Sequence, residues 1–158
     1  MGTVYVNGIS PDTASSITIT RGLFDKPTFT NRIIEQATLN GTAATGNVNI
    51  DMLDRGINYF TSNTTGNVTV NLRGNSTTTL NTMMANGDVA SQTIMLTQGS
   101  TAYFVNNVQI DGVPRVVKWQ SNSTPTAGNA NSVDLYSLTV VKTDSNVYTI
   151  FGSQTQFK

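Results

Sequence analysis

Two aspartates three residues apart could serve acid–base chemistry. They are Asp51 and Asp54 in the stretch IDMLDRG, and paired carboxylates hydrolyse glycosides when a cleft pushes their pKa values apart. On a strand, however, positions three apart face opposite sides. Asp54 also precedes Arg55 and Gly56, a combination typical of a turn. The spacing therefore favours a structural role over a catalytic pair.

Other reactive side chains are missing from the chain. It has no cysteine and no histidine, which excludes thiol catalysis, disulfides, histidine-based triads and the usual structural zinc sites. It has no serine-hydrolase motif, phosphate-binding loop or calcium loop. Asp111 and Asp144 stand beside Gly112 and Asn146, where aspartate suits turn geometry. We predict a protein that is not an enzyme and that uses no metal and no cofactor.

The composition is that of a globular protein with few charges. The chain has 158 residues, enough for one domain with a core; only 11% are charged, and the formal net charge is zero. It lacks a basic face to neutralise a phosphate backbone, so we expect no nucleic-acid partner. A hydrophobic content of 37% argues against disorder. No apolar run approaches the roughly 18 residues of a membrane span, so we expect no membrane partner.

Short stretches that alternate apolar and polar residues predict many strands, because strand side chains alternate between two faces. The cleanest is NVTVNLR at 67–73, which places Val68, Val70 and Leu72 on one face. The others lie at 3–6, 16–20, 32–39, 47–53, 57–61, 91–98, 102–111, 115–119, 132–143, 147–154 and 155–157.

One segment has helical spacing instead. In residues 75–88, Leu80, Met83 and Met84 recur at i, i+3 and i+4. Ser76 or Thr77 could cap the start, and the Asn86-Gly87 pair could end the helix. We predict one short helix of two turns at most.

This pattern predicts an all-β fold, an antiparallel β-sandwich or jelly-roll-like domain with one short helix and an N-terminal arm. A parallel sheet would need a helix between successive strands, and only one helix is expected. We place the β-sandwich at 46–158 and an arm or subdomain for attachment at 1–45. The arm residues expected to bind a partner are Val4, Val6, Ile17, Ile19, Leu23, Phe24 and Phe29.

The single tryptophan stands at the start of a polar loop. Trp119 ends the apolar run RVVKW and precedes QSNSTPTAGNANS. It could be a stacking platform for a sugar, or it could fill the core, where aromatic side chains bury large areas. The apolar neighbours Val116 and Val117 favour the core. We expect Trp119 to end a central strand and seal the core beneath a loop that Pro125 stiffens.

The later part of the chain carries a family resemblance. A Thr-rich strand is followed by a Leu/Met helical turn, an apolar strand ending TQG, a strand leading to one Trp, the loop TPTAG and a closing FGSQTQF. In this order, residues 66–157 resemble a β module of virion structural proteins from tailed bacteriophages, especially marine and cyanobacterial ones. The resemblance implies a non-enzymatic part of the virion.

A small chain with an attachment arm best fits a capsid decoration protein that binds the capsid shell. The expected partners are other virion subunits, the major capsid protein first, and copies of itself; a trimer is implied only by analogy with the family. The alternative is a tail or tail-fibre component that contacts host surface glycans. Either protein would belong to the virion, which is assembled in the host cytoplasm.

Overall fold

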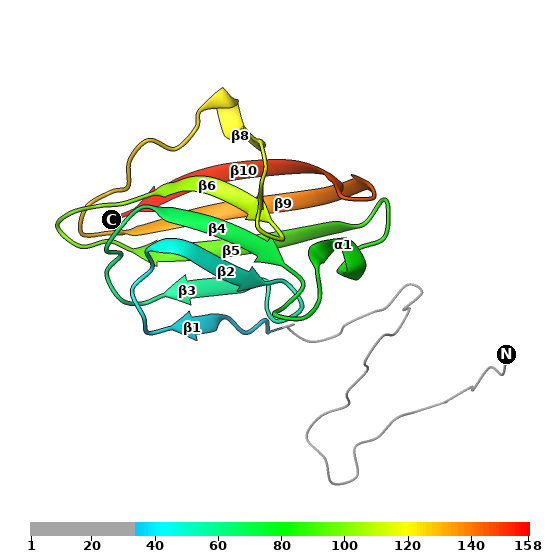
Figure 1. The fold of residues 1–158 in the computed structure, drawn as a ribbon. Helices are drawn as coiled ribbons and strands as arrows, with labels where there is room; N and C mark the ends of the chain where they lie inside the picture. Colours follow the sequence, from blue (N-terminus) through cyan, green and yellow to red (C-terminus); the bar gives the residue numbers. More distant parts are fainter. Residues whose placement is uncertain (1–33) are drawn as a thin grey trace, which may run out of the picture. The chain divides into compact units, whose positions relative to one another are not determined.

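The alternating stretches form two β-sheets packed face to face (Figure 1) in a computed structural model, which describes residues 34–158. The first sheet has the order β1-β3-β5-β9-β10-β8 and contains β1 (Thr38–Asn40), β3 (Ile57–Phe60), β5 (Val89–Thr97), β9 (Val133–Asp144), β10 (Val147–Phe157) and β8 (Val117–Trp119). The second has the order β2-β4-β6-β7 and contains β2 (Gly46–Asp51), β4 (Val68–Arg73), β6 (Val105–Ile110) and β7 (Val113–Pro114). The fold is therefore all-β with two sheets, as expected.

The predicted antiparallel pairing holds for only some of the strands. From β1 to β6 the chain alternates between the two sheets, so that β1, β3 and β5 pair in parallel and β2, β4 and β6 pair in parallel. Between two parallel neighbours of one sheet, the chain runs back through a strand of the other sheet. This strand takes the place of the connecting helix. Both sheets are mixed, because β9 pairs antiparallel with β5 and β10, and β7 pairs antiparallel with β6.

The core lies between the two sheets. Apolar side chains at alternate positions of β4 and β6 meet those of β5, β9 and β10, which is the arrangement that strand alternation predicts. The buried apolar residues are Ala44, Ile50, Phe60, Val68, Val70, Leu72, Leu80, Met84, Ile94, Leu96, Val105, Val108, Ile110, Tyr136, Leu138, Val140 and Ile150.

The helix α1 (Leu80–Met83) confirms the predicted short helix, but its cap differs. Thr79, rather than Ser76 or Thr77, caps the start by accepting a hydrogen bond from the Thr82 N–H. At the other end, the buried Lys142 Nζ donates to the carbonyl oxygens of Asn81 and Met84 at 2.7 and 2.8 Å. Lysine at a helix end supplies donors for carbonyls that lack partners within the helix.

The folded unit begins before the predicted boundary at residue 46. The chain divides into Met1–Ile34 and Glu35–Lys158, and β1 already belongs to the first sheet through its pairing with β3. Sequence alternation is too short in β1 to reveal this. The seven proposed arm residues, from Val4 to Phe29, lie outside the described residues.

Candidate functional site

Trp119 lies at the margin of the core. It ends β8, which is an edge strand of the first sheet and not the central strand that the sequence suggested. Its side chain is half-buried, packs against the core and covers Gly152 of β10. A Cβ atom at position 152 would lie 2.8 Å from ring carbons of Trp119, so glycine is required for this contact. The core interpretation holds only in part.

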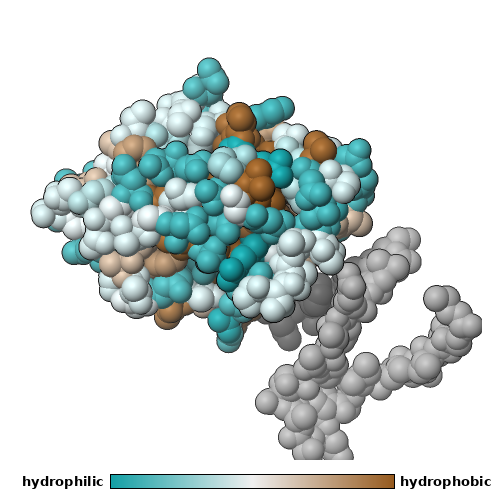
Figure 2. All heavy atoms as spheres, in the orientation of Figure 1, coloured by the Kyte–Doolittle hydropathy of each residue, from teal (hydrophilic) through white to brown (hydrophobic). Residues whose placement is uncertain are grey.

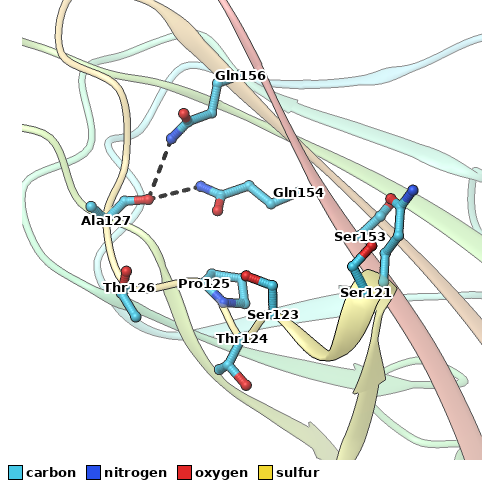
Figure 3. A pocket seen from close by; sticks show the side chains of 10 residues that line it. Ser121, Ser123, Thr124, Pro125, Thr126, Ala127, Ser153, Gln154 and Gln156 are labelled. Carbon is cyan, nitrogen blue, oxygen red and sulfur yellow. Dashed lines mark hydrogen bonds between the residues drawn. The ribbon is translucent and has the colours of Figure 1, made fainter.

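The loop after Trp119 is pinned to the end of β10. Pro125 is buried, and the side-chain amides of Gln154 and Gln156 donate to the Ala127 carbonyl oxygen at 2.9 and 3.4 Å (Figure 3). Gln154 also donates to the Tyr136 hydroxyl at 2.9 Å. The loop is thereby connected to a side chain in the interior of the sandwich.

A hollow of about 430 Å³ lies between this loop and β10. It is lined by Gln120, Ser121, Ser123, Thr124, Pro125, Thr126, Ala127, Ser153, Gln154 and Gln156, eight of which carry a hydroxyl or amide side chain and none of which is charged. Ser121 and Asn122 have φ of 55°. Left-handed backbone at a non-glycine residue is costly and often found at binding sites. The hollow suits a neutral ligand rich in hydrogen-bonding groups.

A second hollow adjoins the first and shares Gln120 and Ser153 with it. It measures about 360 Å³, and its wall includes Lys118, Trp119 and Phe151. Phe151 is 48% exposed, and the Lys118 ammonium lies 5.8 Å from the centre of its ring. This hollow therefore adds an exposed aromatic surface to the polar one.

A buried polar cluster holds the loops behind this region. The Asp134 carboxylate is fully buried and accepts hydrogen bonds from the Gln98 amide and the Asn129 N–H, both at 3.1 Å. Gln98 also exchanges hydrogen bonds with the backbone of Tyr103 at 2.8 and 2.9 Å. Desolvation raises the pKa of Asp134, although the two hydrogen bonds oppose the shift.

Tyr136 is the aromatic residue at the centre of the interior. Its hydroxyl accepts the Val105 N–H at 3.2 Å in addition to the Gln154 amide, and burial raises its pKa far above the ordinary value of tyrosine. Leu135, the preceding residue, faces the opposite side of β9, because side chains alternate along a strand. Tyr103 and Phe104, expected in a strand, precede β6 instead.

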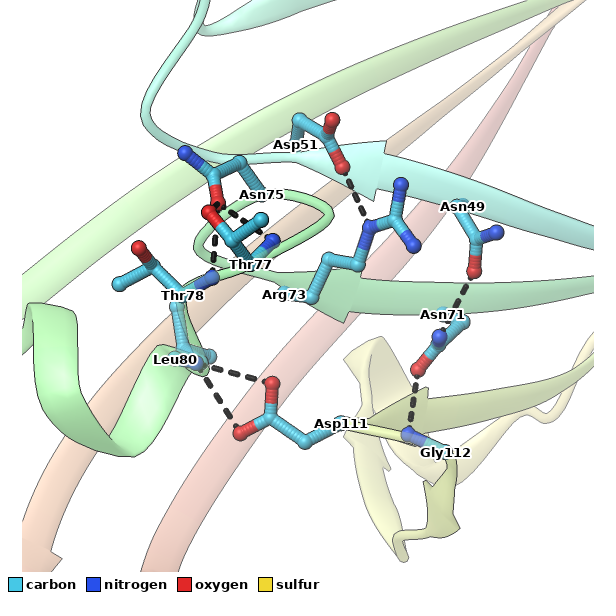
Figure 4. Close-up of polar contacts among 10 residues, drawn as sticks. All are labelled: Asn49, Asp51, Asn71, Arg73, Asn75, Thr77, Thr78, Leu80, Asp111 and Gly112. Carbon is cyan, nitrogen blue, oxygen red and sulfur yellow. Dashed lines mark hydrogen bonds and ion pairs between the residues drawn. The ribbon is translucent and has the colours of Figure 1, made fainter.

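The outer face of the second sheet carries a ladder of polar side chains (Figure 4). The Asn71 amide donates to Asn49 at 2.8 Å, and the Gly112 N–H donates to Asn71 at 2.8 Å. One step along the strands, Arg73 pairs with Asp51 at 2.6 Å. In the view of Figure 2 the surface is mainly hydrophilic, with small separate hydrophobic patches.

The carboxylates do not form a catalytic pair. Asp51 is committed to Arg73, while Asp54 sits in the predicted turn and accepts a hydrogen bond from the Thr38 hydroxyl at 3.2 Å. Asp111 has φ of 52° in the turn between β6 and β7, and its carboxylate accepts the Leu80 N–H at 2.8 Å. Sequence reasoning placed Asp111 in a turn but missed this contact with α1.

Residues 34–158 show neither a metal-binding cluster nor a membrane-spanning helix. No group of three or more histidine, cysteine, aspartate or glutamate residues is placed to hold a metal ion. No helix in this part of the chain is long and apolar enough to cross a membrane.

Comparison with known proteins assigns no family to this chain. No protein family model, no curated protein and no solved structure matches it.

Sequence reasoning did not identify the two hollows beside β10. The only local signal was the hydroxyl-rich loop QSNSTPTAGNANS next to the single tryptophan. The opposing residues Gln154 and Gln156 lie in the last strand, and nothing in their local pattern points to the loop.

Proposed function

We propose that this chain is a non-enzymatic structural subunit of a bacteriophage particle and that it acts as a capsid decoration protein. The observation that supports this best is the open end of the two sheets. Within residues 34–158, the edge strands β1 and β2 each pair on one side only, and both lie at the start of the winding (Figure 1). Unpaired strand edges are sites where another chain can add a strand.

The backbone of β2 is oriented for such pairing. Gly46 donates to Asn67 at 3.0 Å and Met52 donates to Arg73 at 2.8 Å, so the residues at even positions bond to β4. In a parallel ladder the intervening residues point the other way. The backbone groups of Asn47 and Asn49 therefore face the open side, whereas the Asp51 carbonyl oxygen already accepts the Asp54 N–H at 3.1 Å.

The side chains do little to block this edge. Edge strands are commonly guarded by lysine, proline or a bulge, and β2, with the sequence GNVNID, contains neither lysine nor proline. Its one charge, Asp51, is paired with Arg73. The edge strand of the first sheet, β1, differs from β2 in carrying an apolar residue, Leu39. From it an apolar row crosses the outer face of that sheet through Tyr59, Met95 and Leu135.

The partners that fit this role are the major capsid protein and further copies of this chain, with a trimer favoured by analogy alone. The resemblance of residues 66–157 to phage virion modules supports a place in the virion, assembled in the host cytoplasm. Catalysis has no part in the proposal.

The proposal is tested on phage particles that lack the protein. Added full-length chain should coat the capsid shell when the particles are imaged by electron microscopy. Asn47→Lys should weaken this attachment, because a charge then stands at the open edge. Asn107→Lys is the matched control, since Asn107 lies in the same row of the second sheet but on β6. Labelling confined to the tail would contradict the proposal.

A second candidate is a tail or tail-fibre component that contacts host surface glycans. It is favoured by the uncharged hollow between the loop and β10, whose hydroxyl and amide groups suit sugar hydroxyls. The same images separate the two candidates, because a fibre protein would be found at the tail and not over the shell.

A further inference from the structure

The two hollows beside β10 adjoin each other, because Gln120 and Ser153 line both of them. A ligand that contacts these two residues is within reach of both hollows. Volumes of about 430 and 360 Å³ each lie within the range of small-ligand sites. We call this surface the β10 groove and define it by Lys118, Gln120, Thr124, Phe151 and Ser153.

The two parts of the groove differ in chemistry. The loop part presents only uncharged donors and acceptors, chiefly hydroxyls and side-chain amides. The strand part presents the half-exposed ring of Phe151 with the Lys118 ammonium near it. An exposed cation–π contact is weak, so a ligand can displace Lys118 from the ring at little cost.

Neutral sugars match this division. A pyranose ring has a C–H face that packs on an aromatic ring and a rim of hydroxyls that needs many neutral hydrogen-bonding partners. We propose that the β10 groove binds a neutral oligosaccharide, with one unit stacked on Phe151 and the next held by Gln120, Ser153 and the loop hydroxyls.

The groove is built on fixed elements. Gln154 and Gln156 hold the Ala127 carbonyl oxygen, and Pro125 is buried under the loop. Behind the loop, the Asn129 N–H is anchored on the buried Asp134. A loop that is ordered before binding loses little conformational entropy when a ligand arrives, which favours binding of a weakly interacting ligand such as a sugar.

Sugar binding by the β10 groove goes beyond the decoration role. It specifies the ligand of the second candidate function, a tail or tail-fibre component. It rests on that candidate only for the origin of the glycan, the host surface. Binding is measured on the purified full chain, whereas location is measured on particles. A chain that coats the shell yet binds no sugar would refute the groove alone. A chain that binds sugar but sits at the tail would refute the decoration role alone.

The test applies the labelled full chain to arrayed oligosaccharides built from neutral hexoses, N-acetylhexosamines and uronic acids, followed by calorimetric titration of the strongest neutral binder. Phe151→Ala should weaken binding about two- to tenfold, the value of an aromatic contact. Ser153→Leu should weaken it about tenfold or more, because it removes a hydroxyl and fills the junction of the two hollows.

Each variant has a matched control on the same strand. Phe157→Ala removes another exposed aromatic residue of β10, and Thr155→Leu adds a leucine on the same face two residues further on; neither residue lines the groove. Both controls should bind like the wild type, and thermal melting checks that all four variants are folded.

The proposal is overturned if no neutral oligosaccharide on the array is bound. It is also overturned if binding falls equally in Phe151→Ala and Phe157→Ala, or if binding persists in folded Ser153→Leu. Binding to uronic acids alone, abolished by Lys118→Gln and unaffected by the groove variants, would also refute a neutral ligand.

Discussion

At the level of single residues, polar side chains inside the sandwich determine where its loops lie. Asp134 and Gln98 connect the segments around Tyr103 and Asn129, and Lys142 holds the end of α1. Each of these side chains is buried. A buried polar group without partners is costly, so every one of them constrains the backbone that supplies its partners. Among these three side chains the one atom without a hydrogen-bond partner in the described structure is Asp134 Oδ1.

Asp134 makes stability depend on pH in a specific direction. Its pKa is raised by burial, so the folded chain keeps the proton at pH values where the unfolded chain has lost it. The free energy of unfolding should therefore fall as pH rises from the ordinary pKa of aspartate, about 3.9, to the raised pKa of Asp134. Below this window both states are protonated, and above it both are ionised.

Asp134→Asn should remove this decline while keeping an oxygen that accepts from Gln98 and Asn129. The measurement is urea unfolding at a series of pH values for the wild type and the variant, because their difference cancels the contributions of the other carboxylates. Parallel pH profiles would show that Asp134 is not the titrating group.

At the level of elements, the contact between β8 and β10 depends on one glycine. The strands pair in parallel, with Gly152 opposite Trp119. A Cβ atom at Gly152 would stand 2.8 Å from Trp119 ring carbons and from Val117 Cγ1. Because β8 is an edge strand held mainly by this pairing, it must shift when the space is filled.

Gly152→Ala should lower the free energy of unfolding by about 1–3 kcal/mol, the usual cost of overpacking. Gly41→Ala is the control, since no atom lies within 4 Å of a Cβ placed there. Chemical denaturation measures both. A change in the emission of Trp119 in Gly152→Ala would locate the structural change at β8. Equal stability of the two variants would mean that Trp119 moves aside freely.

At the level of the whole molecule, the boundary of the folded unit decides what can be removed. The unit begins at Glu35, and β1 contributes the Asn40 carbonyl oxygen, which accepts the Thr61 N–H at 2.9 Å. The Asn40 amide also donates to Asn58 at 3.3 Å. Removing β1 would expose the edge of β3 and part of the core beneath it.

We expect the free energy of unfolding of a chain of residues 35–158 to equal that of the sandwich in the full-length protein. A chain of residues 46–158 should be less stable by several kcal/mol, because a paired strand and its hydrogen bonds are lost. Urea denaturation followed by circular dichroism compares the two. Equal stability would place β1 outside the cooperative unit.

The chain of residues 35–158 also tests the predicted arm. If residues such as Val4, Ile17 and Phe29 bind the particle, a chain of residues 35–158 should fold yet fail to coat particles that full-length protein coats. Attachment of the full chain should also resist salt, because the net charge is zero and burial with backbone pairing would hold it.

Local pattern predicted the elements well where alternation was long. The strands β4, β5 and β9 and the helix around Leu80 were found in place, because their burial follows directly from residue spacing. The two-residue β7 was missed, and the predicted strand at 32–39 only overlaps β1 (Thr38–Asn40), since three residues or fewer carry no reliable period. The groove was also missed, because its two walls lie some thirty residues apart in the chain.

The sequence by itself determined that this protein is built from strands, that histidine and cysteine chemistry is excluded, and which side of each long strand is apolar. These properties depend on residue type and on nearest neighbours. Only the tertiary structure decided that the strands wind in parallel between two sheets, that Trp119 ends an edge strand and that β10 faces the loop. Alternation specifies a buried face but not the neighbouring strand, because pairing partners are chosen by packing between residues far apart in the chain.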